Sequence, residues 1–142
     1  MNADYTITAD QQRFDLIAVH AFLSRSYWSP GVPMAVVEKA LANSVAFGLF
    51  LGDTQVGLAR VVTDKATFAY LADVYVLEAH RGKGLSKRLL EAVLAHDDLQ
   101  GLRRFLLATK DAHGLYAQFG FKALANPARM MERWHPDAYS AP

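Results

Sequence analysis

The sequence contains no cysteine, and this absence excludes three kinds of chemistry. Without cysteine the chain can form no disulfide scaffold, no zinc ribbon and no thiol nucleophile, and it fits a reducing compartment. Long apolar runs are also missing, because the longest, Val45 to Leu51, falls well short of the ~20 residues that cross a bilayer. The N-terminus has no basic region followed by an apolar run. We therefore expect no signal peptide, no membrane partner and a cytoplasmic location.

The chain also lacks an excess of charge of either sign. Fifteen Lys and Arg residues oppose fourteen Asp and Glu residues, so the net charge of +1 argues against nucleic-acid binding. The five histidines show none of the paired spacings typical of metal sites, so no metal is expected. Charge is nevertheless uneven locally, because Arg81, Lys83, Lys87 and Arg88 crowd into a short stretch. A small polyanion, such as a phosphorylated cofactor, could bind there.

The hydrophobic pattern alternates between strand and helix periods along a chain whose length fits one domain, residues 1–142. It predicts these elements in order: strand Tyr5 to Thr8, helices Phe14 to Ser24 and Pro33 to Asn43, strands Val45 to Leu51, Gln55 to Val62 and Phe68 to Leu77, helix Gly84 to Ala95, strand Phe105 to Ala108, helix Asp111 to Gln118, and strands Phe121 to Leu124 and Met130 to Arg133. This order indicates a mixed α/β sandwich.

Some of these predictions depend on residue type. The stretch from Phe68 to Leu77 is rich in β-branched and aromatic residues, which indicates a central strand buried on both faces, and Phe105 to Ala108 looks like a second buried strand. Pro33 suits the first turn of its helix. Asp111 suits the N-cap of the short late helix, and Gly120 suits its end.

The turn after the long central strand carries most of the functional information. It reads Arg81-Gly82-Lys83-Gly84 and opens directly into an amphipathic helix. The first turn of a helix leaves backbone N–H groups without partners, glycine lets a ligand approach closely, and the helix dipole adds positive charge. These features predict a phosphate site. A tight turn with a solvated basic rim is the alternative, and the patterns of P-loop and dinucleotide-binding folds are absent.

Two motifs in this order resemble the GNAT family of N-acetyltransferases. The stretch Arg81 to Ser86 resembles motif A, Arg/Gln-x-x-Gly-x-Gly/Ala, with Ser86 where Gly or Ala is usual. The stretch Asp111 to Phe121 resembles motif B, Ala-x-x-Leu/Phe-Tyr-x-x-x-Gly-Phe, and Thr109 stands where many members have Asn. The resemblance runs from Tyr5 to Glu132 and implies a mixed, mostly antiparallel central sheet flanked by helices.

The segment Tyr70 to Gly84 is also similar to spermidine/spermine acetyltransferases. Those enzymes have Glu where this chain has Ala72, which weakens the case for a polyamine substrate.

The resemblance implies acetyl-CoA as the co-substrate. Main-chain groups of Val74 to Val76 would pair with the pantetheine arm, and the Val76 N–H would stabilise the acetyl oxygen. Tyr116 would be the general acid toward the CoA sulfur, since tyrosine is protonated at neutral pH; a helical tyrosine that only packs its ring is the alternative. The residues expected to bind the cofactor are Val74, Tyr75, Val76, Arg81, Gly82, Lys83, Gly84, Leu85, Ser86, Lys87 and Thr109.

The group that accepts the amine proton is less clearly marked. Asp73 is a carboxylate in a strand that otherwise looks buried, so it could take the proton through water or hold the ammonium. A structural Asp bonded to neighbouring backbone is an equal alternative. Glu78, His80 and His113 are further candidates.

The acceptor pocket is expected at the loop between the first two helices. Tyr27 and Trp28 lie in this loop beside Gly and Pro, and together with Tyr70 they could wall a site for a cationic or aromatic amine. Alternatively, Tyr27 and Trp28 cap the core.

We therefore expect an acetyl-CoA-dependent N-acetyltransferase that acts directly on a primary amine of a small molecule. The sequence does not fix the oligomeric state, and a homodimer is what the resemblance implies, because members of this family often dimerise. A protein or peptide N-acetyltransferase is one alternative, and a non-catalytic acyl-CoA-binding sensor is another.

Overall fold

The computed structural model describes residues 4–140; residues 1–3 and 141–142, which the single-domain prediction includes, lie outside the described residues. Contacts divide the chain into two compact units, Met1–Ala108 and Thr109–Pro142. Each unit is described by itself. Among residues 4–140, no helix is both long enough and apolar enough to cross a membrane.

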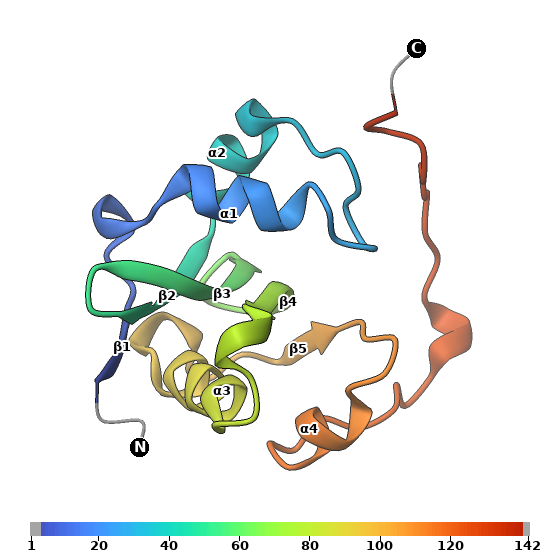
Figure 1. Cartoon of the computed structure of the whole chain (residues 1–142). Helices are drawn as coiled ribbons and strands as arrows, with labels where there is room; N and C mark the ends of the chain where they lie inside the picture. Colours follow the sequence, from blue (N-terminus) through green and yellow to red (C-terminus); the bar gives the residue numbers. More distant parts are fainter. Residues whose placement is uncertain (1–3, 141–142) are drawn as a thin grey trace. The chain divides into compact units, whose positions relative to one another are not determined.

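Within residues 4–108, the first unit is built on a five-stranded sheet with the order β1-β2-β3-β4-β5 (Figure 1). Its strands are β1 (Tyr5–Thr8), β2 (Val45–Leu51), β3 (Thr54–Thr63), β4 (Phe68–Val76) and β5 (Arg104–Leu107). The first four strands pair antiparallel, and β5 runs parallel to β4. The predicted mixed, mostly antiparallel sheet is confirmed.

Helices cover both faces of this sheet (Figure 1). They are α1 (Leu16–Leu23), α2 (Met34–Ala42) and α3 (Leu85–Ala95). The carboxylate of Asp15 caps α1 by accepting the Ala18 N–H at 3.0 Å. Pro33 is the N-cap of α2 rather than a residue of its first turn, because its ψ of 152° is extended. The three helices were predicted to within two residues at each end.

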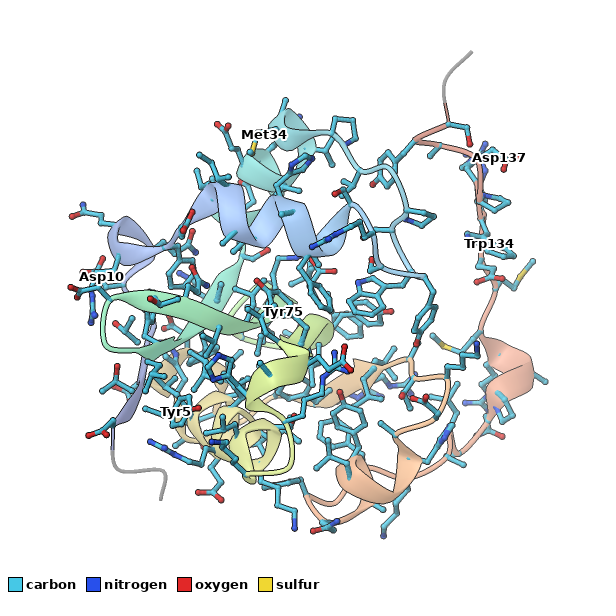
Figure 2. All side chains as sticks on the ribbon, viewed as in Figure 1. Tyr5, Asp10, Met34, Tyr75, Trp134 and Asp137 are labelled. Atoms are coloured by element: carbon cyan, nitrogen blue, oxygen red, sulfur yellow. The ribbon has the colours of Figure 1, made fainter. Side chains whose placement is uncertain are left out.

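Two apolar layers hold the helices on the sheet. On the side of α1 and α2 the buried cluster consists of Val19, Leu23, Val32, Val37, Leu41, Ala46, Leu58 and Tyr75. Tyr75 is labelled in Figure 2, where it lies between the sheet and α1. On the other side α3 buries Leu85, Leu89, Leu90 and Val93. The amphipathic pattern predicted for α3 is therefore confirmed.

The prediction that β4 is buried on both faces is wrong. Phe68 and Tyr70 are exposed, Ala72 and Val74 are half-buried, and the residues between them are buried. The strand β5 is likewise half-buried from Phe105 to Leu107 rather than fully buried. Aromatic and β-branched residues favour a strand whether one face or both faces are covered, so residue type alone could not settle this point.

The second unit contains the helix α4 (His113–Ala117) and a 3₁₀ turn at Pro127–Arg129. Residues 109–140 contain no strand, so the strands predicted at Phe121 to Leu124 and Met130 to Arg133 are wrong. Each segment has only four residues, which is too few to define a strand period.

The predicted N-cap of the late helix is also corrected. The N-cap residue is Ala112 rather than Asp111. The hydroxyl of Thr109 accepts the Ala112 N–H at 3.1 Å, so a neighbouring side chain satisfies the helix start. Gly120 follows the helix with a φ of +89°, a left-handed conformation that suits glycine and ends the helix as predicted.

Candidate active site

The strand β4 has one edge that is only partly paired within the first unit. It pairs with β5 along Phe68–Leu71, where Leu71 lies opposite Leu107, the last residue of β5. On the other edge its pairing with β3 continues to Val76, opposite Gly57. The last five residues of β4 are therefore paired on one side only. Main-chain groups on such an edge can bind another extended segment.

Hydrogen bonds show which main-chain groups face this edge. The N–H of Leu77 donates to the carbonyl of Val56 at 2.8 Å, so the main chain of Leu77 points toward β3. Because successive residues of a strand point their main-chain groups to opposite edges, Tyr75 also faces β3, whereas Val74 and Val76 face the unpaired edge. There the carbonyl of Val76 accepts a bond from Nε of Arg81 at 2.8 Å. Arg81 therefore folds back onto the end of the strand.

A β-bulge interrupts β4 just before these residues. The ladder pairs on either side of it join Ala59 to Val74 and Val61 to Leu71. Between them one residue of β3, Arg60, opposes two residues of β4, Ala72 and Asp73. A bulge turns the side chains on either side of it relative to regular alternation. The predicted strand from Phe68 to Leu77, buried on both faces, did not include this bulge.

The bulge places Asp73 where side chains from two other segments bind its carboxylate. Oδ1 accepts the indole N–H of Trp28 at 2.8 Å, and Oδ2 accepts the Nε–H of Arg60 at 2.8 Å. Arg60 also donates from Nη1 to the hydroxyl of Ser44 at 3.2 Å. Asp73 is only 8% exposed. The hydrogen bonds to Asp73 come from the side chains of Trp28 and Arg60. The alternative in which Asp73 is bonded to neighbouring backbone placed its partners differently.

An aromatic cluster adjoins this carboxylate. The ring of Phe22 stacks on Tyr75 with a centroid distance of 3.9 Å and lies 6.1 Å from the ring of Trp28. Tyr27 meets Trp28 edge-on at 5.1 Å. Burial raises the pKa of Tyr75, and the nearby charges of Asp15 and Asp73 raise it further.

The structure brings Trp28 to Asp73 and leaves the predicted wall residues accessible. Tyr27 is 62% exposed, Trp28 41% and Tyr70 37%. Trp28 therefore packs on Phe22 at the edge of the core and still presents a large surface to solvent. Neither Tyr27 nor Trp28 is a buried cap of the core.

The turn before α3 has the geometry expected of an anion site. Gly82 and Gly84 have φ values of +79° and +72°, which side-chain-bearing residues rarely adopt. A Cβ built at either glycine would meet nothing within 4 Å, so the space above the turn is open. Arg81, Lys83 and Lys87 are exposed around it. The N–H groups of the first helical turn and these side chains fit a diphosphate.

Leu85 and Ser86 occupy different environments in that first turn. Leu85 is 2% exposed and belongs to the core, so only its main chain is available to a ligand. Ser86 is half-buried.

Contacts from β1 support this turn and were not anticipated. The hydroxyl of Tyr5 lies 2.7 Å from Nδ1 of His80, and the Tyr5 carbonyl accepts Nη2 of Arg88 at 3.0 Å. Nζ of Lys83 lies 5.8 Å from the centre of the Tyr5 ring. Figure 2 labels Tyr5 on β1. These partners lie more than seventy positions from Tyr5 along the chain, so no local pattern could reveal them.

Tyr116 and Thr109 belong to the second unit. Tyr116 lies on α4, and its ring meets Phe121 edge-on at 6.1 Å. Among residues 4–140, no group of three His, Asp or Glu side chains could hold a metal ion.

Comparisons with known proteins agree on one family. The model of the acetyltransferase (GNAT) family matches residues 16–121. A protein of Gibberella zeae named as an acetyltransferase is 33% identical over 138 residues, covering 81% of this chain and 77% of that protein. A crystal structure of a GNAT-family acetyltransferase from Xanthomonas campestris pv. campestris is 49% identical with a TM-score of 0.94, covering 96% of this chain and 97% of that one.

A more distant structure shares the fold. It is a GNAT-family acetyltransferase from Elizabethkingia anophelis with acetyl-CoA bound, 13% identical with a TM-score of 0.63, covering 84% of this chain and 76% of that one. None of these descriptions names a polyamine, so the similarity to spermidine/spermine acetyltransferases stays a prediction.

Proposed function

Because the chain belongs to the GNAT family of acetyltransferases, we propose that it transfers the acetyl group of acetyl-CoA directly to a primary amine of a small molecule. Family and relatives make it an N-acetyltransferase; the acceptor and the role of each residue are our proposal. The observation that carries it is the partly paired edge of β4, which ends beside an open glycine turn at the start of α3.

The proposed acetyl-CoA site runs along this edge into the turn. Val74 and Val76 direct main-chain groups outward; those of Val74 would pair with the amides of the pantetheine arm, and the N–H of Val76 would be left for the acetyl oxygen. The diphosphate would lie on the N–H groups that follow Gly84, with Lys83 and Lys87 adding charge. Arg81 already binds the Val76 carbonyl, so its role would be to hold the strand end against the turn. Thr109 remains a proposed cofactor contact of the second unit.

Acetyl-CoA supplies a thioester, whose carbonyl carbon accepts the amine nitrogen as the carbon–sulfur bond breaks. The Val76 N–H would donate to the oxygen on which negative charge develops. The hydroxyl of Tyr116 would give its proton to the departing sulfur, so that CoA leaves as the thiol. The amine nitrogen would lose one proton to water as the new C–N bond forms, and a proton from solvent would restore the tyrosine hydroxyl. Chain groups thus serve the oxygen and the sulfur, and no covalent acyl-enzyme is required.

A compact acceptor is favoured by the loop between α1 and α2. This loop carries the exposed rings of Tyr27 and Trp28 and is fastened to β4 through Asp73. A fixed aromatic wall suits a small amine better than an extended peptide, which needs an open trough. The peptide acetyltransferase and the acyl-CoA sensor remain the alternatives that the assay below separates.

We further propose a single acetyltransferase domain, a cytoplasmic location and a homodimer. The family match at residues 16–121 spans both compact units and supports one domain. Ile17 of α1 is 75% exposed and Val36 of α2 is also exposed, and a second copy could cover these apolar side chains. Sedimentation of the purified protein tests the dimer.

The test of function is acetyl-CoA turnover, read as free thiol, with panels of aryl amines, aminoglycosides, polyamines and peptides. Small amines should stimulate thiol release. Stimulation by peptides alone would favour the peptide enzyme, and binding without turnover would favour the sensor.

The variant Gly84→Glu tests the anion site. It adds bulk and negative charge to the turn and should abolish the rise in Tm, roughly 2.7 kcal/mol of stabilisation at a hundredfold excess of acetyl-CoA over Kd. Gly101→Glu is the matched control, because Gly101 also has a left-handed φ and open space around its Cβ position but lies before β5, near the opposite end of β4. An unchanged ligand shift in Gly84→Glu would place the anion site elsewhere.

A further inference from the structure

We propose that Asp73 is a positioning residue that, oriented by Arg60, holds the indole of Trp28 as a fixed wall of the acceptor site, and that Asp73 does not itself take the amine proton. This inference rests on the proposed function. Asp73 would then be neither the proton acceptor nor the ammonium anchor, and the β4 bulge would serve to direct its side chain toward Trp28.

Both carboxylate oxygens of Asp73 already have hydrogen-bond donors. Oδ1 and Oδ2 each accept a hydrogen bond at 2.8 Å, one from an indole and one from a guanidinium. A general base must reach the proton it takes within hydrogen-bond distance, directly or through one water. Asp73 is 8% exposed, which leaves little surface for either route. The bond from Arg60 fixes the carboxylate, and the carboxylate in turn orients the indole of Trp28.

The ring of Trp28 is fixed by a hydrogen bond and by ring packing. Its indole nitrogen is a donor only, so the carboxylate is a partner that fixes the ring in one orientation. The ring also packs at 6.1 Å from Phe22, which stacks on Tyr75, two residues after Asp73 on β4. Trp28 is therefore held at two points, both connected to β4, while 41% of its surface stays exposed.

Asp73 also lies next to the partly paired edge of β4. Asp73 lies in the bulge, directly before Val74 and Val76, whose main-chain groups face the unpaired edge. A loop fastened at this point borders the segment proposed to hold the reacting thioester. The loop carries the proposed wall of the amine site, whereas the proposed acetyl-CoA contacts belong to β4 and the glycine turn. Loosening the loop should therefore raise KM for the amine more than KM for acetyl-CoA.

The charges specify the class of acceptor. Oδ2 of Asp73 lies 2.8 Å from Nε of Arg60, so the carboxylate is paired with a cation of this chain. The exposed part of the wall is aromatic, with Tyr27 edge-on to Trp28. Such a wall fits one amine carried on an aromatic or apolar body, and it gives no preference to a polyamine.

The experiment uses Trp134→Phe protein, in which Trp28 is the only tryptophan, since the chain has two. Asp73→Ala removes the acceptor of the indole bond, Asp73→Asn keeps an oxygen acceptor without charge, and Trp28→Phe keeps an aromatic ring without the donor. Kinetics are measured with the best amine of the panel.

We expect Asp73→Ala and Trp28→Phe each to raise KM for the amine about tenfold, the effect of losing one hydrogen bond to a charged group. KM for acetyl-CoA should stay unchanged, and the double variant should be no worse than the worse single variant. Asp73→Asn should recover most of the affinity for the amine, and its pH–rate profile should match that of the parent. Emission of Trp28 should shift to the red in Asp73→Ala and much less in Asp73→Asn.

Several results would overturn the proposal. A large fall in kcat for Asp73→Asn that high pH restores would make Asp73 the base. A normal KM for the amine in Trp28→Phe, or additive increases of that KM in the double variant, would show that the two residues do not act together on the amine. Unchanged Trp28 emission in Asp73→Ala would show that Asp73 does not hold the indole. Trp28→Phe changes a partly exposed side chain, so it keeps the test valid if Asp73 variants fold poorly. If the Trp134→Phe parent acetylates no amine, the proposed function fails. The emission of Trp28 in the Asp73 variants still decides whether Asp73 holds the indole.

Discussion

Gly57 offers a direct test of whether the end of β4 is the site of chemistry. Gly57 pairs with Val76 across the sheet, and a Cβ added to it would lie 2.7 Å from the carbonyl oxygen of Tyr75 and 3.0 Å from Cδ2 of Leu49. A contact of 2.7 Å with backbone cannot be relieved by a side-chain rotation, so Gly57→Ala must push β4 outward by a few tenths of an ångström. Gly57 does not have a left-handed φ, so the effect is steric alone.

The displacement predicts two measurable effects. Overpacking should cost about 1–3 kcal/mol, which lowers Tm by roughly 3–10 °C in a chain of this size. Because misplacing a catalytic group by 1 Å costs about a hundredfold, a shift of a few tenths of an ångström at Val76 should lower kcat/KM roughly three- to thirtyfold. Activity is measured well below Tm, with the folded fraction confirmed by circular dichroism.

Gly48→Ala is the matched control. Its Cβ would also meet atoms at 2.7 Å, but these belong to the rings of Phe14 and Phe50. We expect a comparable loss of Tm with little change in kcat/KM, because rings can move while β4 stays in place. Wild-type kcat/KM in folded Gly57→Ala would refute the assignment of the Val76 N–H. Equal losses of activity in both variants would show that the effect is general destabilisation.

Two further predictions concern Tyr116 and Asp64. Tyr116→Phe should lower kcat roughly ten- to ten-thousandfold with little change in KM for acetyl-CoA. The control Tyr139→Phe, in the same unit, should change neither kcat nor KM. A normal kcat in Tyr116→Phe would mean that Tyr116 only packs its ring. The hydroxyl and N–H of Thr67, with the N–H groups of Ala66 and Phe68, donate to the carboxylate of Asp64 and lower its pKa. The ionised carboxylate therefore stabilises the folded state at any pH above the usual Asp pKa of about 3.9. This stabilisation is lost as the pH falls through the lower pKa that Asp64 has in the folded state. Asp64→Asn should therefore lower Tm at pH 7 and not at the acid end of a Tm–pH titration; an equal loss at every pH would contradict the linkage.

Local patterns in the sequence predicted the elements well where periodicity was strong. The strand Val45–Leu51 was predicted at its observed ends, and α3 began one residue after the predicted start. Both have long, consistent apolar patterns. The two late strands were wrong because four residues are too few to define a period, and both segments contain charged side chains, Lys122 in one and Glu132 and Arg133 in the other.

The arrangement of the candidate site could not be predicted in the same way. The bond from Trp28 to Asp73 joins residues 45 positions apart, and it exists because β4 carries an extra residue at the bulge. The strand was predicted from its β-branched and aromatic residues, and residue type alone does not show where a strand carries an extra residue. The glycine turn was different, since Gly82 and Gly84 need left-handed backbone and stand next to the helix they open.

If the proposed sites are right, the bulge in β4 lets one strand border both of them. On a regular strand, Asp73 would continue the alternation of Leu71, and the ladder to β3 would run without a break. The extra residue resets that alternation, so Asp73 turns to Arg60 and Trp28 on the side of α1, while Val74 and Val76 present main-chain groups to the unpaired edge. The loop proposed to face the amine and the edge proposed to face acetyl-CoA are thereby fixed within four consecutive residues. Any change that removes the extra residue should disturb both sites together, whereas changes at Trp28 or Gly84 should disturb one at a time.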